Sequence, residues 1–281
     1  MLELYLRSSL AVFFLIFLLA QQVSLAADTS NSKRRADKWA VVVGISKFAD
    51  SSVPTMKYSR KNAEDFASFL TRECNFARDH VLLLLDEKAT RKGIMLPLGD
   101  SWLPRKASKD DLVVIFLSTF GTPASLDAYR ENYAVAHDTK MEDLYATGIP
   151  FRHLPYLLKS RVASERVVLI IDAPNSGNKE AIRKDLFDSN FRRDDVRGKL
   201  LVLRSSGAGE KSWDSRRYPN SVFTARLMSS IEKTSNLEAA FELMKGKVAE
   251  EVKADFHAEQ NPVMEGNGSD ISIKTRPVGG R

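Results

Sequence analysis

The chain has 281 residues, of which 43% are hydrophobic and 28% are charged, and its formal net charge is +6 with a pI near 9.3. This is an ordinary globular composition, long enough to bury one sizeable core, with no internal repeat and no low-complexity region. The basic residues are scattered and no nucleic-acid-binding motif accompanies them, so we expect no nucleic-acid partner.

Residues 1–26 are predicted to be a signal peptide. Arg7 precedes the apolar run Leu10–Ala20, and Ser24-Leu25-Ala26 supplies the small residues of a cleavage site. The run is shorter than the roughly 20 residues that a membrane-spanning helix needs. We therefore expect an exported protein, periplasmic or secreted, without membrane contact after cleavage. An uncleaved membrane anchor is the alternative. Residues 27–37 are a predicted linker.

Strands and helices are predicted to alternate along the rest of the chain. Apolar runs closed by turn residues predict five buried strands, at Trp39–Ile45, His80–Asp86, Asp111–Ser118, Arg166–Asp172 and Lys199–Ser206. Helical periodicity predicts helices from Ser59, over Ile149–Arg161, over Val222–Ile231 and over Leu237–Val252. Thr90 is a predicted helix N-cap before a short or kinked element, and Asn132–Asp138 is a predicted short strand or hairpin.

This alternation predicts one α/β domain with a mostly parallel central sheet and helices on both faces. The single cysteine, Cys74, cannot form an internal disulfide, and we expect it to be a buried, unreactive thiol. The charged stretch Asn178–Gly198 is a predicted mobile or partly helical connector. After Pro262 the chain is polar and rich in glycine, so we expect it to fray, with residues 266–281 as a flexible tail.

Several stretches have the order and spacing of one known family. They are Lys38–Ile45, Tyr58–Phe69, Asp110–Gly121, Tyr145–Pro150 and Val167–Gly177, followed by Lys199–Ser206 and Asn261–Val263. Together they resemble the caspase-like cysteine peptidases, in particular those of bacterial and metacaspase type. The resemblance implies a caspase-like three-layer sandwich over residues 38–265. Its large-subunit-like part would span 38–178, the connector 179–198 and the small-subunit-like part 199–265.

Both catalytic positions of that family hold other residues here. The family's Ser-Gly-His-Gly motif stands as Ser118-Thr119-Phe120-Gly121, so Phe120 occupies the place of the histidine base. The family's Asp-Ala-Cys-His-Ser-Gly motif stands as Asp172-Ala173-Pro174-Asn175-Ser176-Gly177, so Pro174 occupies the place of the nucleophilic cysteine. Phe120 cannot titrate, and Pro174 has neither a thiol nor the backbone N–H that would hold the oxyanion. Losing one oxyanion donor typically costs about 100- to 1,000-fold in rate.

The resemblance also implies candidate binding residues, which are Asp172, Gly121, Phe120, Pro174 and Ser206. Asp172 matches an acid that lies, in metacaspase-like relatives, in a pocket favouring basic side chains. The alternative is an acid that caps the turn or pairs with a neighbouring base.

Other chemistry has weaker support in the sequence. A relocated nucleophile, Ser118 or Ser176, would need a base within about 3 Å, and His137 alone among the four histidines could approach. The acids Asp138, Glu142 and Asp143 do not have EF-hand spacing, and no phosphate-binding loop or zinc pattern is present. We therefore expect no cofactor and no metal.

The interpretation that these residues favour is an exported pseudopeptidase that binds a protein or peptide ligand over an apolar floor of Phe120 and Pro174. Two alternatives remain. One is an active hydrolase with a relocated nucleophile. The other is a regulatory subunit that pairs with an active caspase-like paralogue.

Overall fold

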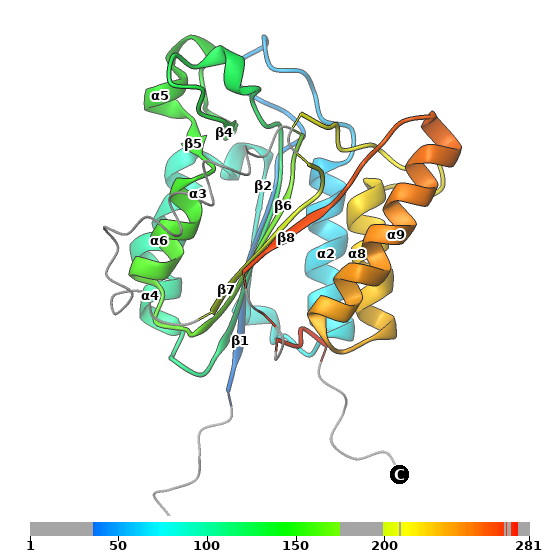
Figure 1. Ribbon diagram of the computed structural model, residues 1–281. Coiled ribbons are helices and arrows are strands. Elements are labelled where there is room, and N and C mark those ends of the chain that lie inside the picture. The colour runs from blue at the N-terminus through cyan, green and yellow to red at the C-terminus, as the bar shows by residue number, and fades with distance from the viewer. Residues whose placement is uncertain (1–35, 175–198, 208, 267, 269–270, 275–281) are drawn as a thin grey trace, which may run out of the picture. The chain divides into compact units, whose positions relative to one another are not determined.

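A six-stranded sheet in the order β2-β1-β3-β6-β7-β8 forms the middle layer of the protein (Figure 1). The computed structural model describes residues 36–174, 199–207, 209–266, 268 and 271–274. Five strands run parallel to their neighbours, and β8 runs antiparallel to β7. The strands are β1 (Lys38–Gly44), β2 (Val81–Leu85), β3 (Leu112–Ser118), β6 (Arg166–Asp172), β7 (Lys199–Arg204) and β8 (Val263–Glu265).

Helices cover both faces of this sheet, as predicted (Figure 1). One face carries α2 (Ser59–Glu73), α8 (Val222–Lys233) and α9 (Leu237–Phe256). The other carries α3 (Arg91–Leu96), α4 (Leu103–Lys106) and α6 (His153–Arg161). The α/β sandwich expected from the alternation of elements is confirmed.

The remaining elements are short and lie between these layers and the loops. Thr90 caps α3, because its hydroxyl accepts a hydrogen bond from Gly93 N at 2.9 Å. The predicted kink follows as a π-turn at Pro97–Ser101. The other short elements are β4 (Tyr133–Ala134), α5 (Leu144–Thr147), β5 (Ile149–Pro150) and single 3-10 turns at Arg78–His80, Asp86–Lys88, Ala124–Leu126 and Met141–Asp143.

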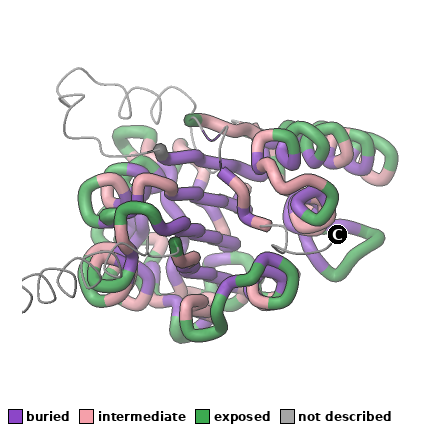
Figure 2. Tube along the Cα trace, turned by 90° about the horizontal axis from the view of Figure 1, so that it is seen from below, coloured by how far each residue is buried: buried purple, intermediate pink, exposed green. Residues whose placement is uncertain are grey.

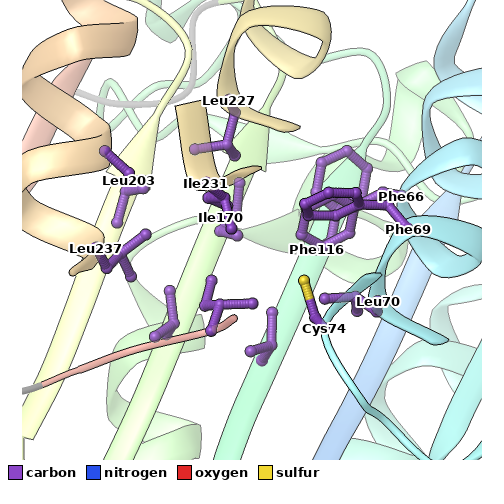
Figure 3. Close-up of a cluster of buried hydrophobic side chains, with 14 of the residues drawn as sticks. Phe66, Phe69, Leu70, Cys74, Phe116, Ile170, Leu203, Leu227, Ile231 and Leu237 are labelled. Atoms are coloured by element: carbon purple, nitrogen blue, oxygen red, sulfur yellow. The ribbon is translucent and has the colours of Figure 1, made fainter. Parts of the chain in front are cut away.

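Two apolar cores, one on each face, hold the layers together. Strands β3 and β6 are apolar along nearly their whole length because side chains on both of their faces are buried. Figure 2 shows the strands as buried and the outer sides of the helices as exposed. On the α2 face, Phe66 and Phe116 stack with ring centroids 4.5 Å apart, and Ile170 and then Leu203 follow Phe116 across the neighbouring strands β6 and β7 (Figure 3). The opposite core contains Phe151, Leu154, Leu158 and Leu169 among other buried side chains.

Cys74 is fully buried in the first core, at the end of α2 (Figure 3). Burial raises the pKa of its thiol to about 12, so the thiolate is not populated near neutral pH. The prediction of a structural thiol is confirmed.

Two predictions of secondary structure are wrong in part. Ile149–Pro150 is not the first turn of a helix but a strand, which pairs antiparallel with Tyr133–Ala134. The chain also does not fray after Pro262, because β8 adds to the sheet edge beside β7. Arg204 and Glu265, on the same face of these two strands, form an ion pair at 2.5 Å.

The core also continues beyond residue 265, where we expected a flexible tail to begin. Ile271 and Ile273 are each 1% exposed, and Lys38 Nζ donates a hydrogen bond to the Ile273 carbonyl at 2.8 Å. The polar composition of this stretch therefore gave no indication that Ile271 and Ile273 complete the core on the α2 face.

The predicted signal peptide, most of the linker, the charged connector and Ser176 lie outside the described residues. Among the helices that are described, none combines the length and the apolarity needed to cross a membrane.

The stacked pair at the centre of the first core makes a stability prediction. Phe116 is fully buried, so Phe116→Ala should leave a cavity and lower the free energy of unfolding by about 3–5 kcal/mol, measured by urea denaturation. Leu243→Ala is the control, since Leu243 on α9 is 38% exposed and should change stability by less than about 1 kcal/mol. Equal losses for the two variants would contradict this account of the core.

Candidate functional site

The candidate site lies at the carboxyl edge of the sheet, where β3 and β6 end side by side. Ser118, the last residue of β3, is in register with Asp172, the last residue of β6, and with Gly44 at the end of β1. Ligands of open α/β sheets bind outside this edge. The two motifs singled out in the sequence, which follow these strands, are therefore brought together by the parallel register.

The segment after β3 is held in place by a ladder of hydrogen bonds to the segment around β4. Val135 N donates to the Phe120 carbonyl at 2.9 Å, and Thr122 N donates to the Tyr133 carbonyl at 2.9 Å. The Thr119 hydroxyl donates to the Val135 carbonyl at 2.6 Å. Phe120 is thereby fixed as a half-buried side chain, and the nearby threonine hydroxyl is already engaged.

Gly121 is the point of closest approach between the two motifs. A Cβ atom at this position would overlap the Pro174 carbonyl oxygen and press on the Phe151 ring. Only glycine allows this approach, so the turn after β3 packs directly on the turn after β6. Phe120 and Pro174, both half-buried, belong to these two adjoining turns.

Asp172 is buried behind this contact, with only 4% of its surface exposed. Its Oδ2 atom accepts hydrogen bonds from the Ser221 hydroxyl, from Thr224 Oγ1 at 2.6 Å and from Asn62 Nδ2 at 3.2 Å. Its Oδ1 atom accepts from Ser212 Oγ at 2.9 Å. We call these five residues together with Ser118 the Asp172 network.

Further hydrogen bonds join the members of the Asp172 network to one another. Asn62 Nδ2 also donates to Ser118 Oγ at 3.2 Å, while Asn62 Oδ1 accepts from Ser221 N at 3.0 Å. Ser221 Oγ in turn accepts from Thr224 N at 3.0 Å, which caps α8. One carboxylate thus ties the end of β6 to α2, to the start of α8 and to the loop that carries Ser212.

Burial dominates the electrostatics of Asp172. Loss of hydration raises the pKa of its carboxyl above the ordinary value, and the hydroxyl donors Ser221, Thr224 and Ser212 oppose that rise. Both carboxylate oxygens already have donors within the protein. This geometry favours the structural role for Asp172, in which its carboxylate fixes the turn after β6. It disfavours a role in which the carboxylate binds a ligand's basic side chain.

A different acid faces solvent beside the network. Asp214 is exposed, and its backbone forms a bridge with Ser221, whose hydroxyl donates to Asp172. Partial loss of hydration and the neighbouring Asp172 carboxyl raise the pKa of Asp214, whereas Lys57 lowers it. Asp214 is therefore the acid that a solvent-borne cation could reach.

Among the described residues, the candidate nucleophile Ser118 is not paired with the candidate base His137. Ser118 is 1% exposed and bonded to Asn62. The Nδ1 atom of His137 lies 2.9 Å from the Lys47 carbonyl, and no hydrogen bond joins His137 to a serine in the described ranges. Ser206, predicted as a binding residue, is 2% exposed and donates to the Glu210 carbonyl at 3.3 Å.

The acidic loop residues do not form a metal site in the part of the chain that the structure describes. Asp138 Oδ1 instead accepts a hydrogen bond from Arg91 N at 2.7 Å, at the start of α3. Within that part, no group of three or more histidine, cysteine, aspartate or glutamate side chains is placed to hold a metal ion.

The comparison with known families agrees with the order of motifs and strands. The model of the caspase domain, a peptidase family, matches residues 37–269. The chain belongs to the caspase-domain family. No curated protein matches it in sequence.

Two crystal structures show the shared fold of this caspase domain. One is protein GSU0716 from Geobacter sulfurreducens, with a TM-score of 0.58 and 16% identity, covering 86% of this chain and 98% of that one. The other is caspase-1 from Spodoptera frugiperda, with a TM-score of 0.59 and 12% identity, covering 89% of this chain and 94% of that one. At these identities the likeness concerns the fold alone.

Sequence reasoning missed the partners of Asp172. Ser221 had a usable signal, since a serine directly before an apolar helical run is a typical N-cap. Asn62 is a polar residue next to the apolar face of α2, and its burial is decided by α8 packing against it. Nothing local marks Ser212 or Thr224 as donors to Asp172.

The raised pKa of Asp172 predicts a pH dependence of stability. The Asp172 carboxyl keeps its proton to a higher pH in the folded protein than in the unfolded chain. The free energy of unfolding therefore decreases as pH rises from about 3.9 through the raised pKa. Asn does not titrate. Asp172→Asn should therefore gain stability relative to the wild type between about pH 4 and about pH 7, measured by urea unfolding at both pH values.

Asp255→Asn is the matched control with the opposite sign. Arg217 lowers the pKa of Asp255, so the stability contributed by this carboxylate is present above the unfolded pKa and is lost as pH falls. Relative to the wild type, Asp255→Asn should lose stability as pH rises from about 2 to about 4, and the difference should then stay nearly constant up to about pH 7. The same direction of change for both variants would refute the assignment for Asp172.

Proposed function

We propose that this caspase domain is a pseudopeptidase that, after export, binds an extended peptide or protein segment at the carboxyl edge of its sheet without cutting it. The observation that carries the proposal is Pro174, which stands in the family's nucleophile position and packs against Gly121 in the turn that carries Phe120. The family's frame is intact, whereas the groups that would move a proton and attack a carbonyl are replaced.

Three independent losses argue against peptide hydrolysis. Phe120 supplies no imidazole, and Pro174 supplies no thiolate. Pro174 also has no N–H to stabilise an oxyanion, so a nucleophile introduced elsewhere would still lack this donor. The hydroxyl groups of Ser118 and Thr119 at the edge are bonded within the protein and lack a base.

Three features of the same edge support binding. Phe120 and Pro174 are half-buried, so their remaining apolar surface faces outward from adjoining turns. Asp214 adds an exposed carboxylate beside the Asp172 network. An extended segment with a basic side chain fits this combination of apolar surface and exposed carboxylate.

Peptidase assays test the first half of the proposal. The purified mature protein should not hydrolyse fluorogenic peptides that end in Arg, Lys or Asp, and a fluorophosphonate probe should not label it, because Ser118 is bonded to Asn62 and His137 is bonded to the Lys47 carbonyl. Labelling that is lost in Ser118→Ala or in Ser176→Ala would establish the relocated nucleophile instead. Trypsin serves as the positive control for both assays.

A binding measurement tests the second half. A phage-displayed library of linear peptides, selected on the mature protein, should yield binders enriched in Arg and Lys. Their affinity, measured by fluorescence polarisation, should fall about tenfold in Phe120→Ala and in Asp214→Asn, because an aromatic anchor or an ion pair is lost. Leu243→Ala, on the exposed side of α9, should bind as the wild type does. Binders that are indifferent to both edge variants would contradict the proposed location.

A further inference from the structure

The loop that joins β7 to α8, residues 205–221, carries two groups of the candidate site. Ser212 donates a hydrogen bond to Asp172, and Asp214 is the exposed acid to which the proposed function assigns a basic side chain of the ligand. We call this segment the β7–α8 loop. The interactions that hold the β7–α8 loop therefore also decide where the Asp214 carboxylate lies.

Gln260 is a fully buried side chain that bonds to this loop at two places. It lies in the segment between α9 and β8. Its Nε2 atom donates to the Ser205 carbonyl at 2.8 Å, and its Oε1 atom accepts from Trp213 N at 2.9 Å. A carboxamide offers a donor and an acceptor on neighbouring atoms. One side chain therefore satisfies a backbone group at the start of the loop and another directly before Asp214.

The two residues that this amide joins are themselves attached to the rest of the site. Ser205 N donates to the Ile171 carbonyl at 2.9 Å, which ties the start of the loop to β6. The Trp213 carbonyl accepts from Val222 N at 2.9 Å, at the start of α8. Trp213 directly precedes Asp214 in the chain. The amide thus connects the edge of the sheet to the backbone from which the Asp214 side chain projects.

The middle of the β7–α8 loop is held by a second and more exposed set of bonds. Glu210 Oε2 accepts from Gly207 N at 2.9 Å and from Asn261 N at 2.7 Å, and Glu210 Oε1 accepts from Asn261 Nδ2 at 2.9 Å. Asn261 is exposed, so water can replace the bond of its side chain. Water has no access to the amide of the fully buried Gln260, and we therefore expect Gln260 to be the stronger constraint on the loop.

We propose that Gln260 is a positioning residue for the basic side chain of a bound peptide. The inference rests on the proposed function, and it assigns the interaction that holds the Asp214 carboxylate where that side chain reaches it. Without the amide, the Ser205 carbonyl would be buried without a partner and Trp213 N would lose its acceptor. The loop would then move to satisfy both groups and would carry Asp214 with it. Phe120 lies on a different turn and would keep its position.

A double-mutant cycle in the full mature protein tests this role. The probes are a fluorescein-labelled linear peptide with one Arg, selected on the wild type, and its counterpart with Ala in place of that Arg. Gln260→Leu should weaken binding of the Arg peptide about tenfold and of the Ala peptide less than about twofold, measured by fluorescence polarisation. In an Asp214→Asn background Gln260→Leu should cause no further loss, because the ion pair through which it acts is already absent. Gln260→Asn, whose shorter amide cannot reach both backbone groups, replaces Gln260→Leu if that variant does not fold.

Ile273→Val is the control for a loss of stability alone. Ile273 is 1% exposed and its carbonyl accepts from Lys38 at the amino end of the sheet, so this variant should lower the melting temperature and leave the ratio of the two peptide affinities unchanged. An unchanged ratio in Gln260→Leu, or additive losses in the double variant, would overturn the role of Gln260 alone. An Arg peptide that is indifferent to Asp214→Asn would overturn the proposed function, and this role with it.

Discussion

The carboxylate of Asp172 is the constraint on which the rest of the candidate site depends. It is buried at the end of β6 and accepts hydrogen bonds from side chains on α2, on α8 and on the loop before α8. A buried carboxylate is costly unless such donors surround it, so the positions of Asn62, Ser221 and Thr224 are coupled to it. Because Asn62 also reaches Ser118, the same network sets the ends of both strands whose turns carry the motif positions.

This arrangement explains how the two turns keep their positions without an imidazole or a thiol at the motif positions. The turns after β3 and β6 are positioned by the Asp172 network, by the hydrogen bonds of Phe120 and Thr122 to the β4 segment and by the close contact at Gly121. None of these interactions uses an imidazole or a thiol. Phe120 and Pro174 therefore occupy the motif positions of a caspase domain whose described part keeps the turns in place, and their side chains make the edge more apolar.

The fold was largely predictable because its strands are long apolar runs and its helices have a clear apolar face. Two local predictions were wrong for the same physical reason. Ile149–Pro150 and Val263–Glu265 are short segments whose structure is decided by a pairing partner distant in sequence, and not by their own pattern. The candidate site was predictable in its motifs, since Phe120 and Pro174 stand in intact frames. The hydrogen-bond donors to Asp172 were not predictable, because they come together only when α2 and α8 pack on the sheet.

The amino-acid sequence by itself determined the α/β class, the family resemblance and the absence of a catalytic pair at the motif positions, because these depend on residue identity and local pattern. The tertiary structure alone decided the role of the acid. The sequence left Asp172 either as a ligand-binding acid or as a structural one, whereas packing buries it among hydrogen-bond donors and leaves Asp214 beside it exposed to solvent. Burial and hydrogen-bond partners set what a carboxylate does, and both are properties of residues brought together by folding.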